Sequence, residues 1–213
     1  MGNFPAAALF DLDGVIVDTE PQYSIFWDKT GATYLHDTDH FGAKIKGNTL
    51  RQIFDRHFAG HEAWQREIAA ALAEWERQMK FYLIPGILDF LSELRSLHIR
   101  TAVVTSSDQA KIQNLWRAHP ELKTFFDIVI TADDITRSKP DPEGYLLAAA
   151  RLNAAPAQSV VFEDSRAGLQ DARAGGMRVV GLTTTLPRDE VAALADTVIE
   201  NFSGVRAHTL FCE

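Results

Sequence analysis

Short apolar runs alternate with helical stripes over the second half of the chain, and this alternation constrains the fold more than any other feature. The apolar runs are typical of strands buried on both faces, and the stripes have the three- and four-residue spacing of amphipathic helices. Strands and helices that alternate over short connections form right-handed crossovers and a parallel sheet. The sequence therefore predicts an α/β fold, with a Rossmann-like parallel sheet flanked by helices. The expected strands are 6–10, 99–105, 127–131, 159–162, 178–182 and 196–199.

The helices expected between these strands have recognisable ends. An apolar stripe from Ile87 to Leu97 predicts one helix, and residues 108–118 predict a second. Asp141-Pro142 opens a third, with Asp placed to cap it and Pro at the first helical position. A fourth begins near residue 165 and ends at Gly175-Gly176, which is typical of a helix C-terminus.

A helical block interrupts this pattern after the first expected strand. From about residue 18 to 82, apolar residues recur at helical steps with charged residues between them. The sequence thus predicts an α/β core from 1–16 and 84–213 and an inserted helical domain over 17–83, with hinges near 15–18 and 82–86. Three of the four tryptophans lie in the insertion, and we interpret them as packing residues; they are Trp27, Trp64 and Trp75.

Composition excludes several classes of protein. With 21 Lys and Arg against 29 Asp and Glu, the net charge is −8. The chain therefore lacks the excess of basic residues that is typical of a nucleic-acid-binding protein. No apolar run approaches the roughly 18 residues of a membrane helix, and the first residues do not have the pattern of a signal peptide. We therefore expect a cytoplasmic protein that binds neither nucleic acid nor membranes. The single Cys212 excludes a disulfide within the chain and a zinc site built from cysteines.

Polar residues follow four of the expected strands. Asp11-Leu12-Asp13-Gly14 follows the first, Thr105-Ser106-Ser107 the second, Ser138-Lys139-Pro140 comes some residues after the third, and Glu163-Asp164-Ser165 follows the fourth. Each of these alone would more often be a turn, a helix cap or a solvated lysine. Ligands of open α/β sheets bind outside the carboxyl ends of the strands, so the ordered set predicts one site.

The residue types in this site point to phosphoryl transfer. Crowded carboxylates repel one another unless a cation is present, and Mg²⁺ prefers oxygen ligands completed by water and phosphate. Lys139 adds a positive charge, and Thr105 and its neighbours offer hydroxyl and backbone N–H donors for phosphate oxygens. An aspartate that accepts a phosphoryl group is one solution for such chemistry. The crowded carboxylates are Asp11, Asp13, Glu163 and Asp164.

The motifs resemble those of the haloacid dehalogenase superfamily, in its β-phosphoglucomutase-like and sugar-phosphate phosphatase-like subgroup with a helical cap. The resemblance covers about residues 7–200, and its most specific stretches are 9–15, 104–107, 138–142 and 162–168. It implies a Mg²⁺-dependent phosphatase that acts on a small phosphorylated metabolite, a sugar phosphate, through an aspartyl-phosphate. The inserted helical domain would be the cap. We expect a monomer or a weak dimer.

The resemblance also implies a role for each core residue. Asp11 would be the nucleophile, and Asp13 would protonate the leaving oxygen and then deprotonate the attacking water, which argues against dehalogenase chemistry. Thr105 and Ser106 would hold the phosphate, and Lys139 would neutralise it beside Asp11. Mg²⁺ would be bound by Asp11, Asp164 and the backbone carbonyl of Asp13, with Glu163 contributing directly or through another ligand.

A sugar phosphomutase is the alternative to a phosphatase. The mutases of this subgroup carry a His in the first cap helix, where this chain has Tyr23, and an Arg in a cap loop, where this chain has Leu50 with Arg51 next to it. Both departures favour hydrolysis. A protein of this fold that only binds its ligand is a further alternative, which the presence of Asp11, Asp13 and Lys139 disfavours. A regulatory or scaffold protein that uses the Trp-rich cap is another, and an exposed apolar patch on the cap would distinguish it.

Specificity should reside in the cap. Lys46, Gly47 and Asn48 are the candidates for a substrate-binding loop that faces the catalytic edge, and Lys44 is a possible helper. The competing interpretation is a solvated basic turn between helices. The four histidines of the block have no spacing that indicates a metal site; they are His36, His40, His57 and His61.

Overall fold

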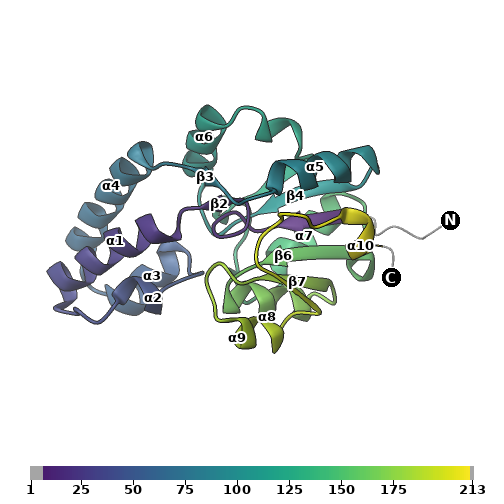
Figure 1. The fold of residues 1–213 in the computed structure, drawn as a ribbon. Helices are drawn as coiled ribbons and strands as arrows, with labels where there is room; N and C mark the ends of the chain where they lie inside the picture. Colours follow the sequence, from purple (N-terminus) through teal and green to yellow (C-terminus); the bar gives the residue numbers. More distant parts are fainter. Residues whose placement is uncertain (1–6, 212–213) are drawn as a thin grey trace.

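The computed structural model describes residues 7–211, so Cys212 and the first residue of the expected strand 6–10 lie outside the described part. A six-stranded parallel sheet runs through the molecule in the order β5-β4-β1-β6-β7-β8 (Figure 1). The strands are β1 (Ala7–Phe10), β4 (Arg100–Val104), β5 (Ile128–Ile130), β6 (Ser159–Glu163), β7 (Arg178–Leu182) and β8 (Thr197–Ile199). The predicted α/β fold class is confirmed. Strand β7 has its expected bounds, and the ends of the other strands lie within one residue of theirs.

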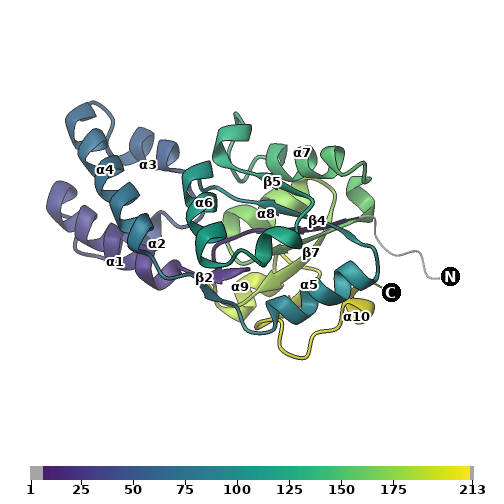
Figure 2. The same ribbon diagram turned by 90° about the horizontal axis from the view of Figure 1, so that it is seen from above.

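The central strand β1 is completely buried because helices cover both faces of the sheet. Alternate side chains of a strand point to opposite faces. Ala8 and Phe10 therefore join one apolar cluster, and Ala7 and Leu9 join the other. The first cluster packs under α5 (Ile87–Ser96), α6 (Gln109–Ala118) and α10 (Ala207–Phe211); the second packs under α7 (Glu143–Arg151), α8 (Arg166–Ala174) and α9 (Arg188–Ala192). Figure 2 shows α7 and α5 on opposite sides of the sheet.

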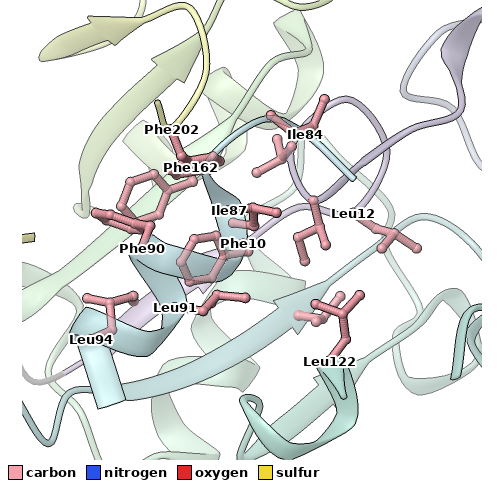
Figure 3. Close-up of a cluster of buried hydrophobic side chains, with 14 of the residues drawn as sticks. Phe10, Leu12, Ile84, Ile87, Phe90, Leu91, Leu94, Leu122, Phe162 and Phe202 are labelled. Atoms are coloured by element: carbon pink, nitrogen blue, oxygen red, sulfur yellow. The ribbon is translucent and has the colours of Figure 1, made fainter. Parts of the chain in front are cut away.

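Aromatic rings give the first cluster its centre (Figure 3). Phe10 stacks on Phe162 of β6 with ring centroids 4.6 Å apart, and Phe90 of α5 meets both rings edge-on. Offset and edge-to-face ring pairs are the favourable geometries for aromatic side chains. This packing fixes β1 against β6, which are the two strands whose ends carry the acidic motifs.

One predicted helix start is wrong in detail. Helix α7 begins at Glu143 with Pro142 as its N-cap residue, so Pro142 is not the first helical position. The Asp141 carboxylate accepts a hydrogen bond from the Glu143 N–H at 3.1 Å. Asp141 thus satisfies a free N–H at the helix start, as expected of a capping side chain, but from one residue further out.

The inserted block is helical, and it lies beyond the carboxyl ends of the sheet (Figure 1). It contains α1 (Glu20–Thr30), a π-helical turn at Gly31–Leu35, α2 (Phe41–Lys44), α3 (Leu50–His57) and α4 (Glu62–Gln78). Their apolar faces share a separate cluster, in which Trp27 is buried and Trp64 and Trp75 are partly buried, as their interpretation as packing residues requires. Among the described residues, no helix combines the length and the apolarity needed to cross a membrane.

The prediction that residues 18–82 are helical throughout is wrong at both ends. Val17–Asp18 (β2) and Tyr82–Leu83 (β3) pair as a two-stranded antiparallel ribbon where the chain enters and leaves the block. The Ile84 N–H also donates to the Ile16 carbonyl at 2.9 Å. The two connections are therefore joined side by side, because their backbone groups satisfy one another.

Candidate active site

The order in which successive strands are added to the sheet reverses at β1. The chain passes from β1 to β4 and β5 on one side and then to β6, β7 and β8 on the other. Ligand sites of open α/β sheets form at the carboxyl ends of strands at such a reversal. A cavity of about 430 Å³ lies here, between the ends of β1, β4 and β6 and the helical block. All nine predicted catalytic, phosphate-binding and metal-binding residues lie on or directly beneath it: Asp11, Asp13, Gly47, Asn48, Thr105, Ser106, Lys139, Glu163 and Asp164.

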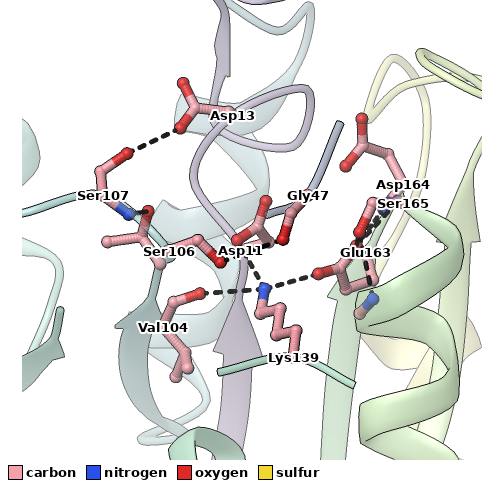
Figure 4. Close-up of polar contacts among 12 residues, drawn as sticks. Asp11, Asp13, Gly47, Val104, Ser106, Ser107, Lys139, Glu163, Asp164 and Ser165 are labelled. Atoms are coloured by element: carbon pink, nitrogen blue, oxygen red, sulfur yellow. Dashed lines mark hydrogen bonds and ion pairs between the residues drawn. The ribbon is translucent and has the colours of Figure 1, made fainter. Parts of the chain in front are cut away.

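Lys139 is the centre of the buried polar contacts (Figure 4). Its Nζ donates to Oδ1 of Asp11 at 2.7 Å and to Oε1 of Glu163 at 2.6 Å, and it also contacts the Tyr145 hydroxyl at 3.2 Å. Burial raises the pKa of Asp11 to about 7, assisted by the negative charges of Glu163 and Asp13 and opposed by the Lys139 ammonium. The lysine side chain is almost fully buried, so its charge acts with little screening by water.

Three carboxylates form a group that could hold a metal ion. Asp11, Glu163 and Asp164 each offer an oxygen within 4.8 Å of the others. Burial raises the pKa of Asp164 well above its ordinary value, and the charges of Glu163 and Asp11 act in the same direction. A divalent cation would relieve this repulsion, and an all-oxygen donor set is the one that Mg²⁺ prefers. The donor set therefore fits such an ion.

Glu163 differs from the two aspartates in its contacts. Its Oε1 accepts hydrogen bonds from Lys139 and Tyr145, and its Oε2 accepts the backbone N–H groups of Asp164 and Ser165, both at 2.8 Å. The side chain is completely buried. Both oxygens are thus already engaged within the protein, which favours a role for Glu163 in holding Lys139 and the loop after β6.

The Asp13 carboxylate is held by three side chains and points away from Asp11 (Figure 4). Oδ1 accepts hydrogen bonds from the Thr19 hydroxyl and the Lys111 ammonium, and Oδ2 accepts one from the Ser107 hydroxyl at 3.2 Å. Asp13 is only partly buried and lines the cavity. Its side chain does not belong to the three-carboxylate group, so only its backbone carbonyl could act as the predicted metal ligand.

The loop after β4 brings hydroxyl groups to the same cavity. The Thr105 hydroxyl accepts from the Ser107 N–H at 3.0 Å, which leaves its proton free to be donated. Asp108 caps α6 by accepting from the Lys111 N–H. The Ser106 hydroxyl donates to the carbonyl of Gly47 at 3.4 Å, and so connects the core loop to the helical block.

The loop 46–49 of the helical block faces the catalytic edge as predicted, but its side chains are largely occupied. Lys46 forms an ion pair of 3.1 Å with Glu20, and the Asn48 side chain accepts from Arg56 and donates to the Ile45 carbonyl. Gly47 has a φ of +76° and lies against Ser165.

Lys44 does not line the cavity. It is the last residue of the short helix α2 and pairs with Asp37 at 2.8 Å instead. The suggestion that it helps to bind substrate is therefore wrong.

Several residues around the site were not predicted. Thr19, Lys111 and Tyr145 contact the predicted residues directly. The burial of one of them could have been predicted from the sequence. Lys111 precedes Leu115 by one helical turn, so it lies on the apolar stripe of α6, where a solvent-facing lysine is not expected.

Comparison with known proteins assigns the chain to a family. The family model of the haloacid dehalogenase-like hydrolases matches residues 8–182 of this sequence, which include every core motif of the site. The chain belongs to this family. The family name agrees with the predicted resemblance, and the observed fold and the convergence of the motifs agree with it as well.

The relatives of this haloacid dehalogenase-like chain include named phosphatases. It is 33% identical to validoxylamine A 7'-phosphate phosphatase from Streptomyces hygroscopicus subsp. limoneus, over 93% of this chain and 95% of the relative. It is 31% identical to a phosphorylated carbohydrates phosphatase from Thermotoga maritima, over 84% and 86%. Among solved structures, CbbY from Rhodobacter sphaeroides in complex with phosphate superposes with a TM-score of 0.75 at 26% identity, over 93% of this chain and 95% of that one.

Proposed function

We propose that the protein is a Mg²⁺-dependent phosphatase that hydrolyses a small phosphorylated metabolite, a sugar phosphate, through an aspartyl-phosphate. One observation carries the proposal: the buried Asp11 carboxylate lies 2.7 Å from the Lys139 ammonium and within 4.8 Å of the Asp164 carboxylate, at the end of the central strand. The chain's phosphatase relatives support the reaction, and the phosphorylated carbohydrates named for one of them support the class of substrate.

In the first step, an oxygen of Asp11 attacks phosphorus. A bond forms between this oxygen and phosphorus while the bond from phosphorus to the leaving oxygen breaks, and Asp13 gives its proton to the leaving oxygen. In the second step, water attacks phosphorus, Asp13 takes the water's proton, and the bond to Asp11 breaks. Asp11 is restored and inorganic phosphate leaves.

The remaining residues supply charge and orientation. Lys139, Thr105 and Ser106 surround the position that the phosphoryl oxygens must take, where fixed donors stabilise charge as it develops. Asp11, Asp164 and the backbone carbonyl of Asp13 would hold Mg²⁺. When bound, the cation neutralises the crowded carboxylates and the phosphate and keeps them in line.

We also propose that residues 17–83 act as a cap on a core of 1–16 and 84–213. The Gln52 side chain donates to the carbonyl of Lys139 at 3.2 Å, and the Ser138 hydroxyl lies 3.3 Å from that of Thr49. In this arrangement the cap covers the site. Its opening at the β2–β3 ribbon would admit substrate, and its closure would exclude water during transfer.

The phosphomutase alternative is less well supported by the cap residues. Tyr23, in the place of the mutase His, donates its hydroxyl to Glu76 at 2.6 Å and not to Asp13. Leu50, in the place of the mutase Arg, lines the cavity. The neighbouring Arg51 lines it too, but its side chain is 86% exposed and pairs with Asp55.

The test is phosphate release from a panel of esters with and without Mg²⁺. The panel contains β-glucose 1-phosphate, glucose 6-phosphate, fructose 1-phosphate, phosphoglycolate and p-nitrophenyl phosphate. Asp11→Asn removes the nucleophile with little change in shape, and Asp89→Asn at an exposed position of α5 is the matched control. We expect release that requires Mg²⁺, survives Asp89→Asn and disappears in Asp11→Asn.

The possible results separate the alternatives. Conversion of β-glucose 1-phosphate into glucose 6-phosphate with little free phosphate would identify a mutase. Release that persists undiminished in Asp11→Asn would exclude the aspartyl-phosphate mechanism. Absence of release from every ester, with binding of inorganic phosphate retained, would favour a protein that only binds its ligand.

A further inference from the structure

Lys111 is a lysine without access to water. It lies on α6 of the core, and none of its side chain is exposed. Its neighbours on the buried face of α6 are Ile112 and Leu115, where an apolar side chain would satisfy the packing. Burying an ammonium is costly unless it is paired, so a lysine at this position requires partners that a leucine would not need.

The partners of Lys111 belong to the catalytic edge. Its Nζ donates to Oδ1 of Asp13 and to the Ser107 hydroxyl at 3.2 Å, and Ser107 in turn donates to Oδ2 of Asp13. Lys111 thus contacts one carboxylate oxygen directly and reaches the other through Ser107. Together with Thr19, these contacts fix the rotation of the Asp13 carboxylate.

The other side of the ammonium is covered by the helical block. The Tyr23 ring of α1 lies 4.3 Å from Nζ, which is the geometry of a cation–π contact. The Tyr23 hydroxyl donates to Glu76 of α4 at 2.6 Å, and α4 packs on α6. The ammonium is therefore enclosed only while α1 and α4 cover α6, because Tyr23 and Glu76 belong to the block and Lys111 to the core.

From these contacts we infer that Lys111 is a positioning residue, which fixes the Asp13 carboxylate for proton transfer when the helical block covers the site. The inference rests on the proposed function, because it assigns Lys111 to the residue that serves the leaving group. Lys111 does not line the cavity, and its ammonium contacts Asp13, Ser107 and Tyr23 but not Asp11, so its effect passes through Asp13.

The choice of leaving group separates this role from a structural one. A sugar alkoxide needs a proton as it departs, whereas p-nitrophenolate leaves as a stable anion. Only the first step depends on the leaving group, because hydrolysis of the aspartyl-phosphate is common to both esters. Loss of Lys111 should therefore lower kcat/KM, which covers the steps up to departure of the leaving group, for sugar phosphates and spare it for p-nitrophenyl phosphate. A general fault in folding, or in binding of the phosphate, would slow both esters alike.

The experiment compares kcat and KM of the wild type, Lys111→Met and Lys111→Arg. The esters are the sugar phosphate of the panel with the highest kcat/KM and p-nitrophenyl phosphate. For Lys111→Met we expect kcat/KM on the sugar phosphate to fall by on the order of 10²-fold, because a misplaced catalytic group costs about this much. The fall on p-nitrophenyl phosphate should be less than about threefold.

Two further variants complete the comparison. Lys111→Arg keeps the cation and should recover most of the lost rate. Lys123→Met changes an exposed lysine of the same core and should match the wild type. Should Lys111→Met not fold, as judged by its thermal transition, Tyr23→Leu is the substitute. It removes the ring from the ammonium and should lower kcat/KM on the sugar phosphate by roughly threefold to tenfold, again sparing kcat/KM on p-nitrophenyl phosphate.

The outcomes distinguish the two claims. A wild type that hydrolyses both esters, with a Lys111→Met variant whose kcat/KM falls equally on both or on neither, would overturn the role of Lys111 alone. A wild type without Asp11-dependent release would overturn the proposed function and the role of Lys111 with it.

Discussion

Lys139 and Glu163 form an ion pair of 2.6 Å in which the glutamate side chain is completely buried and the lysine is 6% exposed. The other oxygen of Glu163 accepts the N–H groups of Asp164 and Ser165. The pair therefore connects the loop after residue 138 to the loop after β6. Without Lys139 the Glu163 charge would be buried without a cationic partner, which is strongly unfavourable, whereas without Glu163 the ammonium would keep its pair with Asp11.

Glu163→Gln tests whether this residue supports Lys139 or binds the metal. The amide keeps the size of the side chain but removes the charge beside the ammonium. We expect kcat to fall roughly 10- to 100-fold, the usual cost of losing a group that orients a catalytic residue or ligand. The Mg²⁺ concentration for half-maximal activity should rise much less than in Asp164→Asn. Exposed Glu200→Gln is the control. Equal shifts in Glu163→Gln and Asp164→Asn would make Glu163 a direct ligand.

Gly168→Ala examines the same carboxylate from α8. A Cβ at Gly168 would overlap the Glu163 carboxylate, which cannot move aside because both its oxygens are engaged. We expect a loss of about 1–3 kcal/mol in the free energy of unfolding and a fall of roughly tenfold or more in kcat. Gly175→Ala at the end of the same helix is the matched control, since its Cβ would meet nothing nearer than 3.5 Å. Chemical denaturation and phosphate release measure the two effects, and a Gly168→Ala variant as active as Gly175→Ala would contradict the account.

Gln52→Ala removes a contact between the helical block and the core. Gln52 accepts from the Thr49 N–H at 2.8 Å and donates to the Lys139 carbonyl. A hydrogen bond contributes about 0.5–1.5 kcal/mol, so KM should rise roughly twofold to tenfold if the covered arrangement binds substrate. Gln113→Ala, at an exposed position of α6, serves as the comparison. Steady-state kinetics on the preferred ester give the answer, and an unchanged KM would mean that this contact does not stabilise the covered arrangement.

The sheet and the core motifs could be predicted because they depend on local signals. Buried parallel strands are continuous apolar runs, and the polar residues that follow them meet at the candidate site. Asp11, Thr105 and Asp164 could therefore be placed there without tertiary information. The β2–β3 ribbon could not be predicted in this way. Two-residue strands are too short to show an alternating pattern, and the pairing joins positions 17 and 83, which are distant in sequence.

Buried charged residues were the other failure. Lys111 and Asp171 lie on helices whose remaining buried residues are mostly apolar, and both would ordinarily be assigned to solvent. Whether a helix face is covered depends on packing partners elsewhere in the chain. For Lys111 these partners include Tyr23 and Glu76 of the inserted block, whose placement over α6 has no local signal.

Asp171 leads to a prediction about stability. Its side chain is buried on α8, and neither carboxylate oxygen has a hydrogen-bond partner among the described residues. Burial raises the pKa of Asp171 from 3.8 to about 8, assisted by the charges of Glu163, Asp141 and Asp11 and opposed by Lys139. The folded protein therefore keeps a proton on this group that the unfolded chain releases. Its favourable contribution is complete below pH 3.8 and is lost as the pH rises toward about 8.

Asp171→Asn removes this titration and keeps the size of the side chain. We expect the variant and the wild type to be equally stable near about pH 4, and the variant to become more stable by roughly 1–3 kcal/mol near about pH 8. Urea unfolding followed by tryptophan fluorescence across this range measures the difference, with exposed Asp89→Asn as the control. If the two stability curves ran parallel, Asp171 would have to be ionised in the folded protein or paired with a group that holds its charge. If Asp171→Asn lost stability most at the alkaline end, the sign of the effect would be reversed and the carboxylate would be stabilising as an anion.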